Sequence, residues 1–165
     1  MSQVTLQGQP IEIQGRFPQV GEPVADFSLA GIGFAPVNLS DFAGKKVVLN
    51  IFPSVDTPIC AMSVRMFNQQ AASKENTAVI CISADLPFAA SRFCAAEGIE
   101  NVTMASFFRA PNFTQSYGVK IAEGPMAGLA ARAVICLDET GKVSHCELVS
   151  EIKTEPDYDA ALAVL

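Results

Sequence analysis

The residue types best suited to chemistry lie in the stretch PSVDTPIC at 53–60, which follows the apolar run VVLNIF. Such a continuous apolar run is typical of a strand that is buried on both faces. We expect Thr57 to cap the following helix and Pro58 to begin it, because proline is favoured at the first helical position. Cys60 then lies in the first helical turn, where unpaired backbone N–H groups and the helix dipole favour an anion. This position favours a thiolate, the nucleophilic form of cysteine.

The helix terminus alone is too weak to ionise a thiol. An ordinary cysteine thiol, with a pKa near 8.5, is only about 3% ionised at neutral pH. Lowering a thiol pKa to about 6 requires about 3.4 kcal/mol, whereas a helix terminus contributes about 0.3–1 kcal/mol and a charged hydrogen bond about 1.5–3 kcal/mol. A cationic donor is therefore needed. We expect Arg132, at the start of a strand, to supply it rather than Arg65, which lies five residues after Cys60 on the same helix.

The remaining cysteines are interpreted mainly as packing residues. The chain contains Cys60, Cys81, Cys94, Cys136 and Cys146. An odd count without a Cys-x-x-Cys pair is not typical of a disulfide scaffold, and with a single histidine the sequence predicts no metal site. Cys81 and Cys136 lie within apolar runs, and Cys146 is also interpreted as packing. A small buried hydrophobe is the alternative for Cys60, and the residues alone leave both roles open for Cys94.

Bulk composition limits the class of protein. The 165 residues are 50% hydrophobic and 17% charged, which predicts one domain over 1–165 with a sizeable core. The net charge of −6, without a run of Lys or Arg, argues against nucleic acid and anionic membranes as partners. No secretory signal and no apolar run of about 20 residues is visible. We therefore expect a cytoplasmic protein without a cofactor, whose partner is a small neutral ligand or another protein.

The order of the expected elements defines a fold class. Strands are expected at 27–31, 37–40, 47–52, 77–84 and 102–105, hairpins at 4–15 and at 131–138 with 143–150, and helices at 58–72, 87–98, 111–118 and 154–165. Thr154 is the expected cap of the last helix. This order predicts an α/β protein of thioredoxin-like architecture, with a mixed central sheet, helices on both faces and an N-terminal β-hairpin extension.

At these residues the chain resembles the bacterial thiol peroxidases, the atypical two-cysteine peroxiredoxins whose working cysteines lie in one subunit. The resemblance spans nearly the whole chain and rests on PSVDTPIC, ISADLPFAASRFCAAEG, GLAARAV and TEPDYDAALAVL. Pro-x-x-x-Thr-x-x-Cys after an apolar strand is the peroxiredoxin signature, and Ser-Arg-Phe-Cys on the next helix is typical of the subgroup. The resemblance implies an antioxidant enzyme that reduces hydrogen peroxide and alkyl hydroperoxides.

The resemblance also implies roles for individual residues. Cys60 would be the peroxidatic cysteine, whose thiolate attacks a hydroperoxide and becomes a sulfenic acid. Thr57 would hydrogen-bond the bound peroxide, with its hydroxyl facing Cys60. Arg132 would hold both the thiolate and the peroxide oxygens, and Pro53 would shield the pocket.

Cys94 would be the resolving cysteine, which forms a disulfide with Cys60. Because a disulfide needs Cα atoms within about 7 Å, and cysteines on separate helices seldom meet that limit, we expect one or both helices to unwind locally during turnover. The resemblance implies thioredoxin as the electron donor and a homodimer as the working unit.

Other interpretations remain open from the sequence. A thiol–disulfide oxidoreductase acting on proteins should contain Cys-x-x-Cys, which this chain lacks, whereas a peroxide sensor would use the same cysteines as a peroxidase. Arg132 could instead be a surface residue that pairs with an acidic neighbour. The apolar residues Phe52, Phe88 and Phe93 suggest that the pocket accepts organic hydroperoxides.

Overall fold

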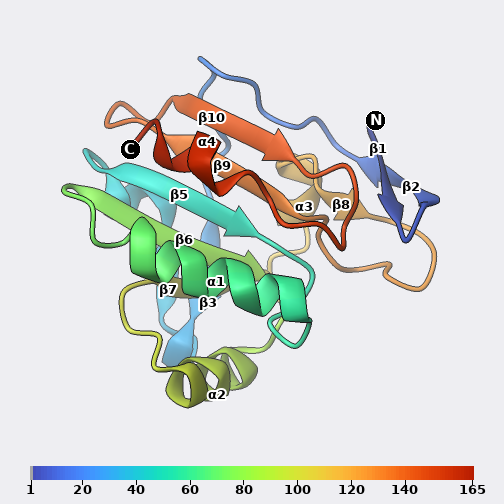
Figure 1. The fold of residues 1–165 in the computed structure, drawn as a ribbon, viewed down its shortest axis with the longest axis horizontal. Helices are drawn as coiled ribbons and strands as arrows, with labels where there is room; N and C mark the ends of the chain where they lie inside the picture. The colour runs from blue at the N-terminus through green and yellow to red at the C-terminus, as the bar shows by residue number, and fades with distance from the viewer. Residues whose placement is uncertain (1) are drawn as a thin grey trace.

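The computed structural model describes residues 2–165, which fold around a seven-stranded sheet with the order β10-β9-β5-β6-β7-β3-β4 (Figure 1). Its strands are β3 (Ser28–Gly31), β4 (Pro36–Asn38), β5 (Lys46–Ile51), β6 (Thr77–Ser83), β7 (Thr103–Ser106), β9 (Ala133–Leu137) and β10 (Val143–Leu148). Strands β5, β6 and β7 pair in parallel, and the other pairs are antiparallel. The prediction of a mixed central sheet is therefore confirmed.

Strand β5 shows how the sheet divides the core into two layers. Its residues are almost all buried, and successive side chains point to opposite faces. Val48 and the following Phe52 pack in one apolar cluster, whereas Leu49 and Ile51 pack in the other. A continuous apolar run is thus explained by a strand covered on both sides.

Helices cover both faces of the sheet, as predicted. The helical elements are η1 (Ile32–Phe34), η2 (Leu39–Phe42), α1 (Pro58–Gln70), α2 (Pro87–Glu97), α3 (Phe113–Ser116) and α4 (Tyr158–Leu162). Helices α1 and α4 lie over one face of the sheet in Figure 1, and α2 lies lower, beside β7. On the opposite face, Phe113 and Tyr117 from the α3 region pack into the apolar cluster that contains Leu49 and Ile51.

The N-terminal hairpin consists of β1 (Ser2–Leu6) and β2 (Gln9–Gln14), joined by Gln7 and Gly8. Both turn residues have positive φ, at 51° and 83°, which is typical of a tight two-residue hairpin turn. A third strand that we did not predict, β8 (Lys120–Ile121), pairs with β2 and completes a small separate sheet at one end of the molecule (Figure 1).

Two expected helices are shorter than predicted. The helix predicted over 154–165 begins at Tyr158, so Thr154 is not its cap. Asp157 caps it instead, accepting a hydrogen bond from the backbone N–H of Ala160 at 3.1 Å. The physical reason is Pro156, which disfavours helical backbone at the residue before it. The helix expected at 111–118 is a single turn.

Within residues 2–165, no helix is long and apolar enough to cross a membrane.

Candidate active site

Cys60 lies at the start of α1 in the arrangement expected from the sequence. Thr57 is the N-cap residue, with extended backbone at φ −106° and ψ 143°, and Pro58 is the first helical residue. The preceding strand β5 brings this turn to the carboxyl end of the parallel strands, where sites in such sheets usually lie. Cys60 itself has no exposed surface.

The guanidinium of Arg132 is in direct contact with this sulfur. Its Nη2 lies 3.3 Å from Cys60 Sγ, and its Nε donates a hydrogen bond of 2.8 Å to the carbonyl of Ile152. The side chain is only 2% exposed, so the alternative of a surface residue paired with Asp138 or Glu139 is wrong. Within residues 2–165, Nη1 is buried and lacks a hydrogen-bond partner. A buried donor of this kind is costly unless a ligand satisfies it.

A pocket of about 380 Å³ opens above this pair. It is lined by Leu6, Gln7, Pro53, Thr57, Pro58, Ile59, Met126, Arg132, Ile152 and Lys153. Three residues named from the sequence, Pro53, Thr57 and Arg132, therefore meet at one cavity, with buried Cys60 behind them.

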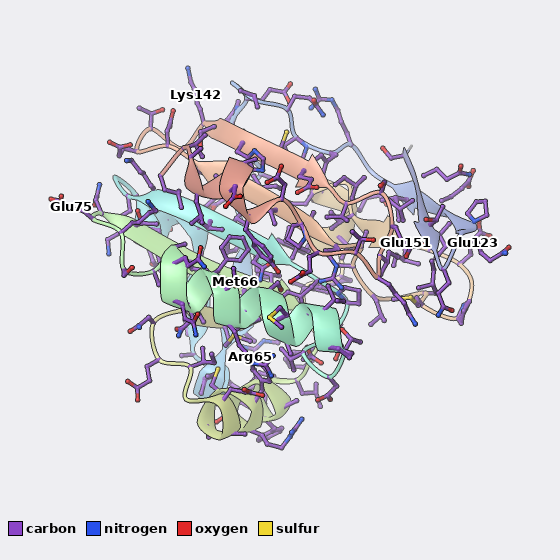
Figure 2. All side chains as sticks on the ribbon, viewed as in Figure 1. Arg65, Met66, Glu75, Glu123, Lys142 and Glu151 are labelled. Carbon is purple, nitrogen blue, oxygen red and sulfur yellow. The ribbon has the colours of Figure 1, made fainter. Side chains whose placement is uncertain are left out.

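Sequence reasoning missed the outer wall of the pocket. The hairpin residues Leu6 and Gln7 form part of it, together with Ile152 and Lys153 from the C-terminal segment. The hairpin is tied there by Glu151, whose Oε1 accepts hydrogen bonds from the Thr5 hydroxyl at 2.9 Å and the Gly8 N–H at 3.0 Å. Figure 2 labels Glu151 beside the hairpin. Alternating apolar residues predicted the hairpin but did not indicate where it packs.

The phenylalanines on which we based the expectation of an apolar pocket do not line it. Phe52 is fully buried in the core, Phe88 is 70% exposed on α2, and Phe93 borders a different groove. The apolar wall is instead made of aliphatic and thioether side chains from the hairpin, α1 and the loops, among them Leu6 and Met126.

The Thr57 hydroxyl, which we expected to face Cys60, has another partner. It donates a hydrogen bond of 2.9 Å to the carbonyl of Ser54. The side chain makes no capping bond to the helix, although the residue lines the pocket. Its oxygen keeps lone pairs that can accept from a bound ligand.

Cys94 lies on α2, half-buried against the apolar cluster that also contains Cys60. All five cysteines are free thiols. Burial raises the pKa of the Cys94 and Cys146 thiols, and it raises the pKa of both Cys81 and Cys136 to about 12. The last two stay protonated at neutral pH, which agrees with their interpretation as packing residues.

The architecture and the buried cysteine–arginine pair define a redox protein of the thioredoxin-like class. Residues 19–162 match the Redoxin family. The chain is 55% identical to a thiol peroxidase of Corynebacterium glutamicum, over 100% of this chain and 99% of the relative, and 51% identical to a thiol peroxidase of Vibrio cholerae, over 98% and 99%. Among solved structures, a peroxiredoxin-like protein from Aquifex aeolicus superimposes with a TM-score of 0.93 at 36% identity, covering 99% of this chain and 95% of that one.

The chain therefore belongs to the thiol peroxidase family, and the prediction of a thiol-dependent peroxidase is confirmed at that level.

Proposed function

We propose that Cys60 is the peroxidatic cysteine, and that it reduces hydrogen peroxide and alkyl hydroperoxides. The thiolate sulfur attacks the terminal peroxide oxygen, the O–O bond breaks, and two electrons pass from sulfur to the substrate. A proton converts the leaving oxygen to water or an alcohol, and Cys60 becomes a sulfenic acid. The observation that supports this role most directly is the 3.3 Å contact between Cys60 Sγ and buried Arg132 Nη2 beneath the pocket.

Arg132 has two functions in this proposal. One nitrogen stabilises the sulfur anion, and the unpartnered Nη1 is available to a peroxide oxygen as negative charge develops on it. The hydrogen bond from Nε to Ile152 fixes the guanidinium plane before substrate binds. Thr57 would contact the bound peroxide from the pocket wall, and Pro53 would limit the access of water.

The apolar pocket supports the acceptance of alkyl hydroperoxides. Its wall includes Leu6, Ile59, Met126 and Ile152, which can pack against an alkyl or aryl group while the peroxide oxygens reach Arg132. Leu6→Ser should lower catalytic efficiency for cumene hydroperoxide more than for hydrogen peroxide, since only the bulky substrate reaches the wall. Equal losses for the two substrates would contradict this assignment.

We further propose that Cys94 resolves the sulfenic acid. Its thiol sulfur attacks Cys60, water leaves, and a Cys60–Cys94 disulfide forms. The two cysteines lie on different helices and are both reduced here, and we expect local unwinding to bring them within the Cα distance that a disulfide needs. A dithiol protein of the thioredoxin type then returns both thiols, which suits the reducing cytoplasm.

A homodimer is part of the same proposal. Phe34 and Phe88 pack edge to face at 5.1 Å between ring centroids, and Phe108 lies 6.1 Å from Phe34. Phe88 is 70% exposed and Phe108 41% exposed, which leaves an aromatic surface that a second copy could cover. Phe88→Ser should shift the protein to monomer in analytical ultracentrifugation if this surface forms the dimer contact.

The decisive experiment adds one equivalent of hydroperoxide to reduced protein, blocks the free thiols and maps the peptides by mass spectrometry. With the blocking reagent added under denaturing conditions, so that buried thiols also react, we expect a Cys60–Cys94 cross-linked peptide with the other three cysteines alkylated. Cys94→Ser should stop at an oxidised Cys60, and Cys60→Ser should not react. If Cys60 stopped at sulfenate or sulfinate while Cys94 stayed free in the parent protein, the resolving role would be wrong.

A further inference from the structure

Two ion pairs connect the segments that contain Cys60 and Cys94. The first joins Asp56, in the loop before α1, to Arg92 on α2, with 2.9 Å between Oδ1 and Nη2. This ion pair is exposed: 63% of the Arg92 side chain and 64% of the Asp56 side chain are accessible to solvent. It therefore links the turn that precedes Cys60 to the helix turn that contains Cys94.

The second ion pair is less exposed and has two hydrogen bonds instead of one. Arg65 on α1 reaches Glu97 at the end of α2 with two hydrogen bonds, from Nε at 3.0 Å and from Nη2 at 2.7 Å. Figure 2 shows Arg65 between the two helices. The guanidinium lowers the pKa of the Glu97 carboxyl, so the pair is charged at neutral pH. About a third of each side chain remains exposed, which keeps the pair accessible to salt.

The placement of the pairs relative to the cysteines is regular. Each cysteine lies between the two charged residues of its own segment: Cys60 between Asp56 and Arg65, and Cys94 between Arg92 and Glu97. A groove of about 300 Å³ separates the segments, with Ala61 on one side and Phe93 on the other. We call these two ion pairs the helix clasp.

We propose that the helix clasp opposes the local unwinding that brings Cys60 and Cys94 together, and so sets how long the sulfenic acid persists. This inference rests on the proposed resolving role of Cys94. While the clasp is closed, a second hydroperoxide can oxidise the sulfenic acid to a sulfinic acid and leave as water or an alcohol. When it opens, Cys94 displaces water and forms the disulfide. The clasp therefore controls the ratio of these two outcomes.

The expected effects are modest, because exposed ion pairs contribute little. Removing one pair should accelerate disulfide formation about 1.5- to 5-fold, the range that measured surface pairs correspond to. Raising the salt from about 0.01 M to about 1 M shortens the Debye length from about 30 Å to about 3 Å and should have the same effect in the parent protein. The rate at which Cys60 attacks hydroperoxide should not change, because neither ion pair includes Cys60 or Arg132.

The test compares Glu97→Gln with a matched control, Glu22→Gln. Glu22 forms a bidentate pair with Arg16 at 3.0 and 2.6 Å, outside both helices. Rapid quenching after a pulse of hydrogen peroxide, followed by mass spectrometry, gives the rate of disulfide formation and the sulfinate fraction. Glu97→Gln should form the disulfide faster and accumulate less sulfinate, whereas Glu22→Gln should match the parent protein.

A charge swap separates the clasp from a general loosening of the fold. Arg65→Glu combined with Glu97→Arg should restore the slow parent rate, which a merely destabilised helix would not do. The proposal is overturned if Glu97→Gln leaves the rate and the sulfinate fraction unchanged, or if it slows disulfide formation, since the clasp would then hold the cysteines together. If the parent protein forms no Cys60–Cys94 disulfide at all, the proposed function fails first.

Discussion

Arg132→Met tests the proposed chemistry most directly. Methionine keeps much of the buried volume but removes the charge, the 3.3 Å contact to Cys60 and the 2.8 Å bond to Ile152. A hydrogen bond to a charged group contributes about 1.5–3 kcal/mol, and about 1.36 kcal/mol is a factor of ten in rate, so the second-order rate constant with hydrogen peroxide should fall about 10- to 150-fold. The rate constant of Arg132→Lys should lie between those of the parent protein and Arg132→Met, because an ammonium group keeps the charge but cannot reproduce a planar group that donates in two directions.

The assay has to follow Cys60 itself. The chain contains no tryptophan, so rapid quenching with a thiol-blocking reagent and mass spectrometry is preferable to fluorescence. Arg65→Met is the matched control, because its guanidinium bonds Glu97 and should leave the oxidation rate unchanged. Thermal unfolding of each variant excludes loss of the fold. A folded Arg132→Met protein that reacts with peroxide at the parent rate would refute the role of the guanidinium.

Other expectations concern buried polar groups and ionisation. Ser63→Ala should lower the free energy of unfolding in urea by about 1–3 kcal/mol, because it leaves the buried Asn50 amide, now 3.1 Å from the Ser63 hydroxyl, without its oxygen acceptor; an unchanged midpoint would contradict this. In the folded reduced protein at pH 9, iodoacetamide should leave Cys81 and Cys136 unmodified, because the pKa of each thiol is about 12, and mass spectrometry should find them alkylated only after denaturation. Hydrogen bonds from the backbone N–H groups of residues 153 and 8 lower the pKa of Glu151 from 4.5 to about 2. The ionised carboxylate therefore stabilises the fold above pH 4.5, and this contribution is lost as the pH falls toward 2. The difference in melting temperature between the parent protein and Glu151→Gln should shrink over that range, and a constant difference would refute the stabilising role of Glu151.

The sequence was sufficient for the features that depend on local chemistry. Pro58 at the first helical position and Gly98 at the end of α2, with φ 65°, mark helix boundaries that the structure confirms. The apolar run of β5 predicts burial on both faces, because the side chains of consecutive residues point to opposite faces and all of them are apolar or buried. The need for a cation near Cys60 followed from the free energy of ionising a thiol, and the choice of Arg132 followed from its expected position at the start of a strand; in the structure it immediately precedes β9.

Features that depend on distant contacts could not be predicted in this way. Nothing in the alternation of 4–15 indicates that Leu6 lines the same pocket as Ile152, because the position of the hairpin depends on Glu151 accepting hydrogen bonds from it. The two-residue strand β8 has too few residues to show a period. The Thr57 hydroxyl was misplaced because a carbonyl three residues earlier competes for it, and such local turns leave little trace in composition.

The buried contact between Cys60 and Arg132 joins residues that lie 72 positions apart in the chain. On the ribosome, the proposed peroxidatic cysteine therefore emerges well before its arginine, and before the Ile152 carbonyl that orients that arginine. A nascent chain that contains α1 but not β9 has the Cys60 thiol without its contact to Arg132. If Cys60 is the peroxidatic residue, synthesis itself delays its activation until most of the sheet that surrounds it can form.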